Sequence, residues 1–483
     1  MSDARLPEGR HFALTWTVPE TYGGQTSSML HRSRAFVQVG GVPVDVLTFD
    51  PRADYPAFGQ RLRERRELID GMRLLNVWDW LRDAKVARRP EPLGSPQRVF
   101  TPLGADPAYR SERRDGVEVL RTRYAADGKT ELQVDHFRTD GSLLLSDRRD
   151  GHQEGVVGGR SLVLCDRSGE PIRSWGKSWS LYSWWLDRLT KGADAFLIVD
   201  SRPMAEYLRT YRKPGRATVH VVHGSHLLRG RVGPWGRLVP SRAAVFRDLD
   251  AFDSVVFLTH RQRRDAELLS GRHRNLAVIP NSRPLPPLEK QRTDRARNAG
   301  AMLSALSELK RVDHGIRAVL LARRLTGTDL HLDIYGEGHL RRALQRQIAE
   351  AHAEEFIRLH GYQPDARDRL AEVSFLLMTS RTEGFALVLL EAMAAGCIPI
   401  SYDIRYGPAE LIEHGENGFL VSKGGAGALA HAILQLQRMP PEQVDRMRRN
   451  ARRTAERYTD EAVLPLWTAE LTAALARNRA SLP

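Results

Sequence analysis

The chain has 483 residues, more than one ordinary hydrophobic core holds, so we expect two domains. Its 73 Lys and Arg residues outnumber its 59 Asp and Glu residues, and the formal net charge of +14 favours anionic partners. Cys165 and Cys397 lie far apart without a partner motif, which excludes a disulfide scaffold and fits a reducing compartment. With no apolar run of about 18 residues and no signal-peptide core, we expect a cytoplasmic protein, at most peripheral to a membrane.

The first predicted elements form a strand, a turn, a helix and a second strand. The strands are expected at residues 12–17 and 44–49, with the helix over residues 27–40. Gly23 and Gly24 lie in the turn ahead of the helix. Because glycine has no Cβ, such a turn lets a ligand approach the backbone closely, so both glycines are candidate binding residues.

Residues 98–175 have a different character. Residues 117–124 and 131–138 alternate apolar and polar side chains, and a third short run follows at residues 142–145. Asp-Gly pairs stand at residues 127–128, 140–141 and 150–151. This pattern is typical of an antiparallel meander, so we predict a β module inserted into the N-terminal domain. Acceptor binding and self-association both remain open as its role.

Short apolar runs separated by helical stretches then predict parallel sheets, at residues 195–200, 218–223, 254–259, 277–280, 330–335, 357–360, 373–378 and 398–401. A Pro-rich, charged segment at residues 281–296 is interpreted as a linker, followed by a second α/β set from residue 301 and a helical tail at residues 442–479. The predicted domains are residues 1–97 and 176–285 (N-terminal, in two parts), 98–175 (β insertion), 286–455 (C-terminal), and 456–483 (a helix packing back toward the N-terminal domain).

Glu383 and Glu391 stand eight residues apart in the C-terminal domain. The loop at residues 382–386 follows a predicted buried strand and leads into a helix, whose N-terminal N–H groups and dipole suit a diphosphate. Eight helical residues rise about 12 Å, the span between a donor sugar and a nucleoside ribose. Two solvated acids on an amphipathic helix are the alternative for this spacing alone. The Gly384-Phe385 pair and the strand that follows the helix favour a nucleotide-sugar site without a metal.

This pattern resembles the E-x7-E motif of glycosyltransferase family 4, whose members are retaining enzymes with the GT-B fold. The resemblance implies an α/β protein of two doubly wound Rossmann-like domains, with the antiparallel β insertion in the N-terminal one. It further implies that Glu383 contacts the donor sugar and acts in catalysis, and that Glu391 contacts the ribose. The diphosphate would be held near Gly24 and the helix start, at Gly384, Phe385, Ala386 and Leu387.

Residues 306–313, Leu-Ser-Glu-Leu-Lys-Arg-Val-Asp, are similar to the phosphate loop of this family. The similarity implies that Lys310 neutralises the diphosphate and acts in catalysis, with Arg311 as a second cation. A surface lysine opening a helix is the alternative for Lys310. Ala305 stands at the position of the family's arginine, which leaves a catalytically weak scaffold as an alternative for the whole chain.

Other family positions follow from the same resemblance. Gly361 and Tyr362 match the loop where the family's backbone contacts uracil, which implies a UDP-sugar. The turn at residues 336–338 is expected to be structural. His223 and His226 follow a strand where the family places a histidine near the reacting centre, so both are catalytic candidates; a buried packing histidine is the alternative. Their spacing does not fit zinc, and no metal or cofactor is expected.

Residues 401–410 and the strand-turn-strand at residues 134–143 resemble poly(ribitol-phosphate) and poly(glycerol-phosphate) α-glycosyltransferases and the related serine-rich-protein O-GlcNAc transferases. They imply transfer of a hexose or N-acetylhexosamine from UDP-GlcNAc or UDP-glucose to a polyanionic acceptor such as teichoic acid. A protein serine, a lipid or a natural product is the alternative acceptor. We expect no nucleic-acid partner, a location in the cytoplasm extending to the inner face of the membrane, and a homo-oligomer formed through the β insertion.

Overall fold

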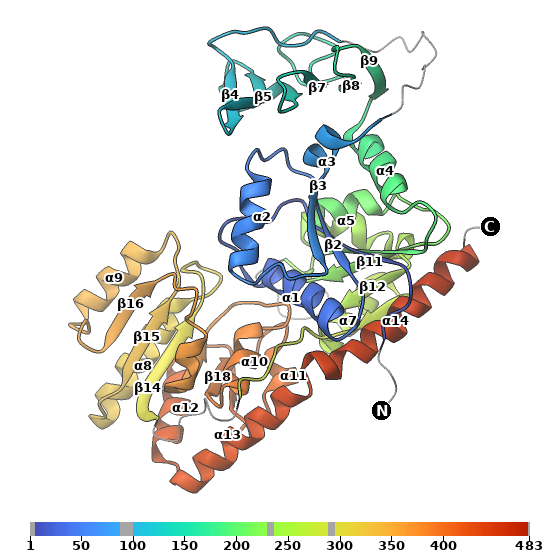
Figure 1. Ribbon diagram of the computed structural model, residues 1–483. Helices are drawn as coiled ribbons and strands as arrows, with labels where there is room; N and C mark the ends of the chain where they lie inside the picture. The colour runs from blue at the N-terminus through green and yellow to red at the C-terminus, as the bar shows by residue number, and fades with distance from the viewer. Residues whose placement is uncertain (1–4, 87–99, 229–235, 288–294, 482–483) are drawn as a thin grey trace. The chain divides into compact units, whose positions relative to one another are not determined.

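The structure is a computed structural model that describes residues 5–86, 100–228, 236–287 and 295–481 (Figure 1). The chain divides into two compact units. We call one the large unit, which comprises Met1–Pro7, Gly23–Gly41 and Ala217–Ser481. The other, the small unit, comprises Glu8–Tyr22, Val42–Arg216 and Leu482–Pro483.

Parallel strands form the core of the small unit. They pair in the order β10-β1-β2-β3, with bounds β1 (Arg10–Leu14), β2 (Val44–Thr48), β3 (Met72–Asn76) and β10 (Ala195–Val199). Every residue of β10, Ala-Phe-Leu-Ile-Val, is buried, as expected for a strand that helices cover on both faces. The helices of this unit are α2 (Tyr55–Glu64), α3 (Val77–Asp83), α4 (Ser178–Leu189) and α5 (Arg202–Leu208).

An antiparallel meander occupies the middle of the small unit, and the predicted β insertion is confirmed. Each strand pairs with the next along the chain: β4 (Arg110–Arg114), β5 (Val117–Tyr124), β6 (Glu131–Phe137), β7 (Leu143–Arg148), β8 (Ser161–Cys165) and β9 (Pro171–Trp175). The turn between β5 and β6 shows why Asp-Gly marks these hairpins. The Asp127 carboxylate accepts hydrogen bonds from two backbone N–H groups, and Gly128 adopts a φ of 64°, which glycine tolerates best.

The meander packs on α3 through a few specific contacts. The Trp78 ring stacks on His136, with centroids 3.9 Å apart. The Arg82 Nε donates to the carbonyl of Phe137 at 2.9 Å. Because His136 is fully enclosed, burial holds its pKa well below the usual histidine value, so the ring is neutral at physiological pH.

The large unit contains two sets of parallel strands. The first pairs in the order β11-β12-β13, with bounds β11 (Arg216–Val222), β12 (Ser254–Phe257) and β13 (Leu276–Val278). The second has the order β16-β15-β14-β17-β18-β19, with bounds β14 (Ala296–Leu303), β15 (His331–Tyr335), β16 (Ile357–Gly361), β17 (Val373–Met378), β18 (Ile398–Tyr402) and β19 (Phe419–Val421). The order reverses between β14 and β17, which creates a topological switch point where ligands bind in open α/β sheets.

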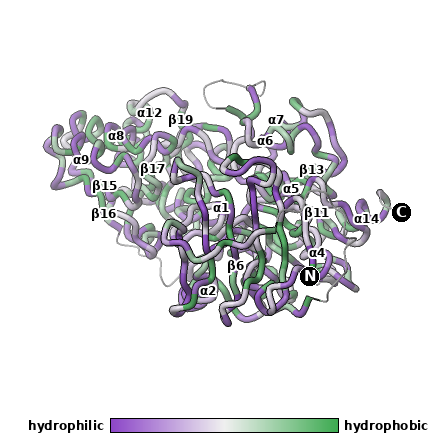
Figure 2. The backbone as a smooth tube through the Cα atoms, turned by 90° about the horizontal axis from the view of Figure 1, so that it is seen from above, coloured by the Kyte–Doolittle hydropathy of each residue, from purple (hydrophilic) through white to green (hydrophobic). Residues whose placement is uncertain are grey.

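Helices surround these strands. Their bounds are α1 (Gly24–Gln38), α6 (Pro240–Phe246), α7 (His260–Ser270), α8 (Val312–Thr326), α9 (Arg341–Glu350), α10 (Leu387–Ala394), α11 (Pro408–Leu411), α12 (Ala426–Arg438), α13 (Pro441–Glu456) and α14 (Asp460–Ser481), with 3-10 turns η1 (Leu249–Ala251) and η3 (Asp368–Ala371). Figure 2 shows largely hydrophilic residues along α9. Leu344 and Ile348 of this helix are buried. This amphipathic pattern is typical of a helix that covers a sheet.

The C-terminal helix α14 lies beside α1 (Figure 1). The Trp467 ring contacts Phe36 edge to face, and the Arg32 guanidinium lies 5.2 Å from its centroid. Asn478 donates to the Asp253 carboxylate at 3.1 Å, just before β12. The last helix of the chain is therefore part of the same packed unit as the first.

Some boundaries differ from the sequence prediction. Helix α1 begins at Gly24 rather than at residue 27, because Gly23 provides the extended N-cap. Strand β14 begins at Ala296 rather than at residue 301; its first residues are partly exposed and therefore show no apolar run. The predicted helical tail is two helices, since the chain leaves the helix between Glu456 and Asp460. Across the described ranges, we find no helix with both the length and the apolar character needed to span a bilayer.

Candidate functional site

The two loops that leave β14 and β17 meet at the switch point of the second sheet. Parallel strands β14 and β17 are neighbours, so their carboxyl ends lie at the same edge. Lys310 is in the first loop and Glu383 is in the second, and the Nζ of Lys310 lies 2.5 Å from the Oε1 of Glu383. The structure thus brings together the predicted phosphate-binding lysine and the first predicted carboxylate.

Arg311 fixes the loop that carries Lys310. Its Nε donates to the carbonyl of Thr379 at 2.8 Å, and its second terminal nitrogen donates to the carbonyl of Ser380 at 2.9 Å. The guanidinium also lies over the Tyr402 ring, 4.7 Å from its centroid. Burial lowers the pKa of Arg311 from its usual value. The donors of the Arg311 side chain are thus directed toward backbone carbonyls of the protein, which argues against the predicted contact with phosphate.

The turn at Gly336 and Gly338 packs against the backbone of the loop that follows β14. A Cβ on Gly336 would lie 1.9 Å from the carbonyl oxygen of Ser304, and one on Gly338 would lie 2.3 Å from that of Leu306. No side chain fits at either position. Ala305, which lies between these contacts, is exposed.

Glu391, the second predicted carboxylate, is held by two arginines that the sequence analysis did not single out. Its Oε1 lies 2.9 Å from the Nε of Arg283 and 3.1 Å from the Nε of Arg367. The Arg283 side chain is 6% exposed and that of Glu391 is 11% exposed, whereas Arg367 is 54% exposed. Both arginines also donate to the Oγ of Ser27 in α1. Burial lowers the pKa of Arg283.

The N-termini of α1 and α10 lie close together. A Cβ on Gly24, the first residue of α1, would lie 3.5 Å from the Cδ1 of Leu387, the first residue of α10. Neither helix has a side-chain cap or an acidic residue in its first turn. The positive dipole ends of both helices therefore lie close together, an arrangement suited to an anion, which is the role expected of Gly23, Gly24 and Leu387.

Gly384 is pressed against the end of β11. A Cβ at this position would lie 2.0 Å from the carbonyl oxygen of His223. Gly407 makes a similar approach to the carbonyl of Phe385, with a distance of 2.2 Å from its ideal Cβ. The loop that carries Glu383 is thus packed between two backbone segments, and the half-buried His223 lies next to it.

His226 lies in an aromatic core. Its ring stacks on Phe246 with centroids 4.8 Å apart and on Tyr406 at 5.8 Å, and the residue has no exposed surface. Burial lowers its pKa to about 4, against a smaller opposite effect of Asp265. A side chain without exposed surface does not contact a substrate, so the structure favours a packing role for His226 over the predicted catalytic one.

The segment between β18 and α11 is fastened to α7. The carboxylate of Asp265 accepts from the Nε of Arg405 at 2.6 Å and from the hydroxyl of Tyr406 at 2.8 Å. The Gln262 amide donates to the carbonyl of Gly224, which follows His223. These bonds hold the distinctive Tyr402–Glu410 region against the loop after β11, although no sequence pattern marked Asp265 as its partner.

The predicted base-binding residues lie apart from this cluster in the sequence, at the end of β16. Gly361 ends the strand with a φ of 82°, and Tyr362 is 55% exposed.

Phe385 and Ala386 are buried ahead of α10, with Ala386 in the left-handed conformation at a φ of 66°. Within the described ranges, no group of three or more His, Cys, Asp or Glu side chains is placed to hold a metal ion.

Comparison with known proteins defines the class. Residues 289–454 match the family model described as Glycosyl transferases group 1. A crystal structure of a variant of S. aureus TarM, in complex with fondaparinux, α-GlcNAc-glycerol and UDP, superimposes with a TM-score of 0.73. It shares 19% identity and covers 96% of this chain and 100% of its own. The fold is GT-B, as predicted.

The sequence relatives include glycosyltransferases with two kinds of acceptor. The chain is 22% identical to the poly(ribitol-phosphate) α-N-acetylglucosaminyltransferase of Staphylococcus aureus, over 94% of this chain and 98% of the relative. It is 25% identical to the poly(glycerol-phosphate) α-glucosyltransferase of Bacillus subtilis, over 59% of this chain. It is 30% identical to the GtfA subunit of the Streptococcus gordonii peptide N-acetylglucosaminyltransferase, over 46% of this chain. The chain spans 42% of the second relative and 45% of the third.

Replacing Glu391 by Gln should destabilise the fold more than the same change at Glu383. Glu391→Gln leaves the buried Arg283 without a charged partner, which costs about 3 kcal/mol of the free energy of unfolding. Glu383→Gln releases the more exposed Lys310, at about 1 kcal/mol or less. Urea unfolding of both variants measures the difference. Equal destabilisation would show that the Arg283 pair does not hold the structure.

Gly384→Ala should lower stability because its Cβ overlaps the carbonyl of His223. The expected loss is about 2 kcal/mol, typical of overpacking in a rigid environment. Gly424→Ala is the matched control, since nothing lies within 4 Å of an added Cβ there. Thermal unfolding of the two variants gives the comparison, and a Gly384→Ala protein as stable as the control would contradict the packing described.

The free energy of unfolding should fall as the pH is lowered, in part because of His226. Its pKa of about 4 in the folded protein is below the unfolded value of about 6.5, so only the unfolded chain gains a proton between these values. The stability is complete above about pH 6.5, and about 3 kcal/mol is lost as the pH falls toward the folded pKa. His226→Phe should flatten the pH dependence measured by urea unfolding. The same change at the exposed His431 should leave it unaltered.

Proposed function

We propose that this protein is a metal-independent, retaining α-glycosyltransferase that moves a hexose or N-acetylhexosamine from a UDP-sugar to a polyanionic acceptor. A poly(alditol phosphate) of the teichoic acid type is the acceptor class. The observation that carries the proposal is the convergence of two uncapped helix N-termini, those of α1 and α10, beside Lys310 and Glu383.

The helix starts and Lys310 would stabilise the diphosphate leaving group. Backbone N–H groups at Gly24 and Leu387 supply fixed dipoles that need no reorganisation as negative charge develops. Lys310 adds a full positive charge that is balanced by Glu383 before the donor binds. Exchange of that carboxylate for phosphate oxygens would then free Glu383 to contact the sugar. The exposed Arg367 is a second cation near α1.

The two carboxylates keep acceptor capacity for hydroxyl groups. Both arginine contacts of Glu391 are made by Oε1, and Lys310 likewise contacts Oε1 of Glu383. The second oxygen of each carboxylate can therefore accept from a ligand, since a carboxylate has about four lone-pair sites. We assign Oε2 of Glu391 to the ribose hydroxyls and Oε2 of Glu383 to a hydroxyl of the transferred sugar. His223, whose carbonyl lies against Gly384, would lie near the reacting sugar.

Similarity to the poly(ribitol-phosphate) and poly(glycerol-phosphate) enzymes supports a phosphate-rich acceptor. The formal net charge of +14 fits the same class, because a basic surface raises the local concentration of a polyanion. Similarity to the GtfA subunit supports a protein serine as the second candidate acceptor, reached by the same donor chemistry. In that case the insertion β4–β9 is the element that would meet a partner protein.

Incubation with UDP-GlcNAc or UDP-glucose and a poly(glycerol phosphate) acceptor should release UDP. Glu383→Gln should lower kcat by about a hundredfold or more, because it removes a contact aimed at the transition state. Coupled detection of UDP and mass spectrometry of the acceptor measure the two products. Release that is no greater in the unaltered protein than in Glu383→Gln would disprove the transferase activity.

Salt separates the two acceptor classes. The apparent affinity for a polyanion should fall steeply between about 50 and 500 mM salt, since the Debye length shortens over this range. A serine-rich peptide acceptor should show little change under the same conditions. The measurement is KM for each acceptor at a fixed, saturating UDP-sugar concentration, with UDP-sugar KM as the internal control.

A further inference from the structure

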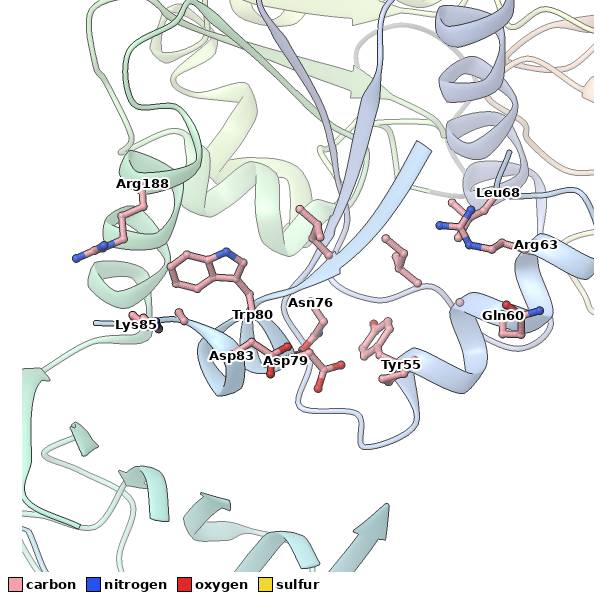
Figure 3. A pocket seen from close by; sticks show the side chains of 15 residues that line it. Tyr55, Gln60, Arg63, Leu68, Asn76, Asp79, Trp80, Asp83, Lys85 and Arg188 are labelled. Carbon is pink, nitrogen blue, oxygen red and sulfur yellow. Dashed lines mark hydrogen bonds between the residues drawn. The ribbon is translucent and has the colours of Figure 1, made fainter. Parts of the chain in front are cut away.

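The small unit contains a cavity of about 580 Å³ that shares no residue with the site described above. Its walls come from α2, β3, α3 and α4. Figure 3 shows Trp80, Lys85 and Arg188 together at one end, with Gln60, Arg63 and Leu68 at the other. Its size falls in the range of small-molecule sites, which is about 300–1,000 Å³.

Cations without an internal partner lie at both ends of the cavity. In the described part of the chain, the side chains of Arg63 and Lys85 have no hydrogen bond or ion pair, and both are exposed. Arg188 lies over the Trp184 ring, 4.5 Å from its centroid, which leaves the donors of its guanidinium for a ligand. Free guanidinium and ammonium groups at two separate points suit a ligand that carries more than one anionic group.

The middle of the cavity is suited to hydroxyl groups and not to phosphate. Asp79 and Asp83 lie there beside Asn76 (Figure 3). The Oδ1 of Asp79 accepts from Arg82 and Arg114, each at 2.6 Å, so its Oδ2 is left for a ligand. Carboxylates accept hydrogen bonds from hydroxyl groups but repel an anion.

Apolar surface completes the lining. Leu74 and Leu75 of the edge strand β3 are half-buried and line the cavity, as does the half-buried Trp80. The Trp80 ring has edge-type contacts with Trp184, at a centroid distance of 6.1 Å. A large aromatic surface beside polar groups is suited to the C–H groups of a sugar or polyol, which have both apolar and polar faces.

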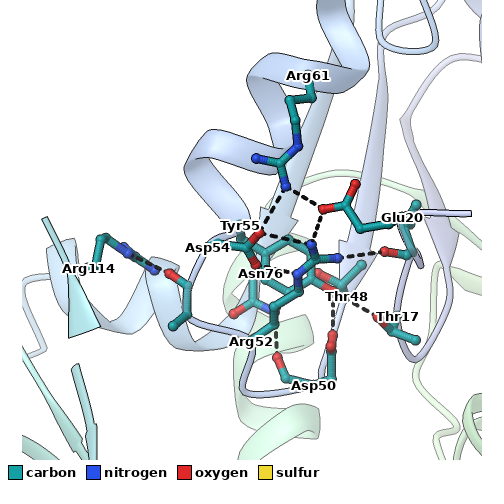
Figure 4. A network of polar contacts seen from close by, with 12 residues as sticks. Thr17, Glu20, Thr48, Asp50, Arg52, Asp54, Tyr55, Arg61, Asn76 and Arg114 are labelled. Atoms are coloured by element: carbon teal, nitrogen blue, oxygen red, sulfur yellow. Dashed lines mark hydrogen bonds and ion pairs between the residues drawn. The ribbon is translucent and has the colours of Figure 1, made fainter. Parts of the chain in front are cut away.

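The wall formed by α2 is rigid. Figure 4 shows Arg52 and Arg61 sharing the carboxylates of Glu20 and Asp54 near the start of the helix. Arg114 of the meander donates to both Ala53 and Asp79, at 2.6 Å each, and so joins this wall to α3. Hydrogen bonds from Arg52 and Arg61 lower the pKa of Asp54. These contacts connect two walls of the cavity, and walls that are held in place before binding reduce the entropic cost of binding.

We infer that this cavity binds a phosphorylated polyol or sugar, with the phosphates at Lys85 and Arg188 on one side and at Arg63 on the other, and with the hydroxyl-bearing carbons between them. A segment of polymeric acceptor and a free sugar phosphate share this chemistry. The choice of polymer as the ligand rests on the proposed function, whereas the assignment of the cavity as a binding site does not. If the ligand is polymer, the cavity holds the chain at a point separate from the residues that bind the nucleotide sugar.

Titration calorimetry with three probes tests the inference: a glycerol phosphate oligomer, glycerol 3-phosphate and glycerol. The oligomer and glycerol 3-phosphate should bind and glycerol should not. Lys85→Ala and Arg63→Ala should each weaken binding about tenfold, the usual effect of losing one charged hydrogen bond. Lys129→Ala, which removes another exposed lysine from a turn of the small unit, should have no effect.

Each outcome decides the matter. Tighter binding of the oligomer than of glycerol 3-phosphate identifies polymer as the ligand, and equal binding identifies a free phosphorylated polyol. Two results would overturn the inference. One is glycerol binding with the same affinity as glycerol 3-phosphate, and the other is a Lys85→Ala protein that binds as tightly as Lys129→Ala does. Glu383→Gln should keep full oligomer binding. Oligomer binding without UDP release would therefore reject the proposed transferase while retaining this cavity as a site.

Discussion

The contact between Glu391 and Arg283 is the interaction on which the arrangement of the donor residues depends. Glu391 belongs to α10, Arg283 to the segment ahead of β14, and both are largely buried. Arg283 also reaches Ser27, so the same guanidinium fixes α1 relative to α10. Three segments from distant parts of the sequence are thereby held at one carboxylate. Desolvation of both charges offsets most of the stability that the intact pair adds, but separating the two charges would leave one of them buried and unpaired. The pair therefore acts mainly as a constraint on the geometry.

Pairing with carboxylates also explains how several cations can be held in fixed positions at this site. In the large unit two helix N-termini lie close together, Lys310 is paired with Glu383, and Arg283 and Arg367 both contact Glu391. Without anions such a cluster would repel itself. Glu383 and Glu391 neutralise it through one oxygen each and leave the other oxygen available. The carboxylates thus act as counter-ions to these cations, and in the proposed function they become hydroxyl acceptors when a diphosphate takes over the neutralising role.

Local pattern was sufficient to predict much of this. The strands β5, β6, β17 and β18 and the start of α10 follow from apolar runs and Asp-Gly turns. The choice of Lys310 and Glu383 as site residues came from the family resemblance of two separate motifs, and their direct contact was not predicted. Arg283 and Arg367 could not be found in this way, since each is defined by a partner far away in the sequence. His226 shows the opposite limit. Its place after a strand predicted a reacting residue, but the rings of Phe246 and Tyr406 enclose it.

The net charge is the weakest guide to anion binding, because many arginine side chains donate hydrogen bonds to the protein's own backbone carbonyls. Arg311 donates to two loop carbonyls, Arg295 to those of Leu370 and Val373, and Arg138 to those of Leu143 and Cys165. Burial lowers the pKa of each, which shows the cost of placing a cation inside. The formal net charge therefore overstates the number of cations that are free to meet a polyanion. Under the inference made for the cavity of the small unit, the cations that remain exposed there would decide where an anionic chain is held.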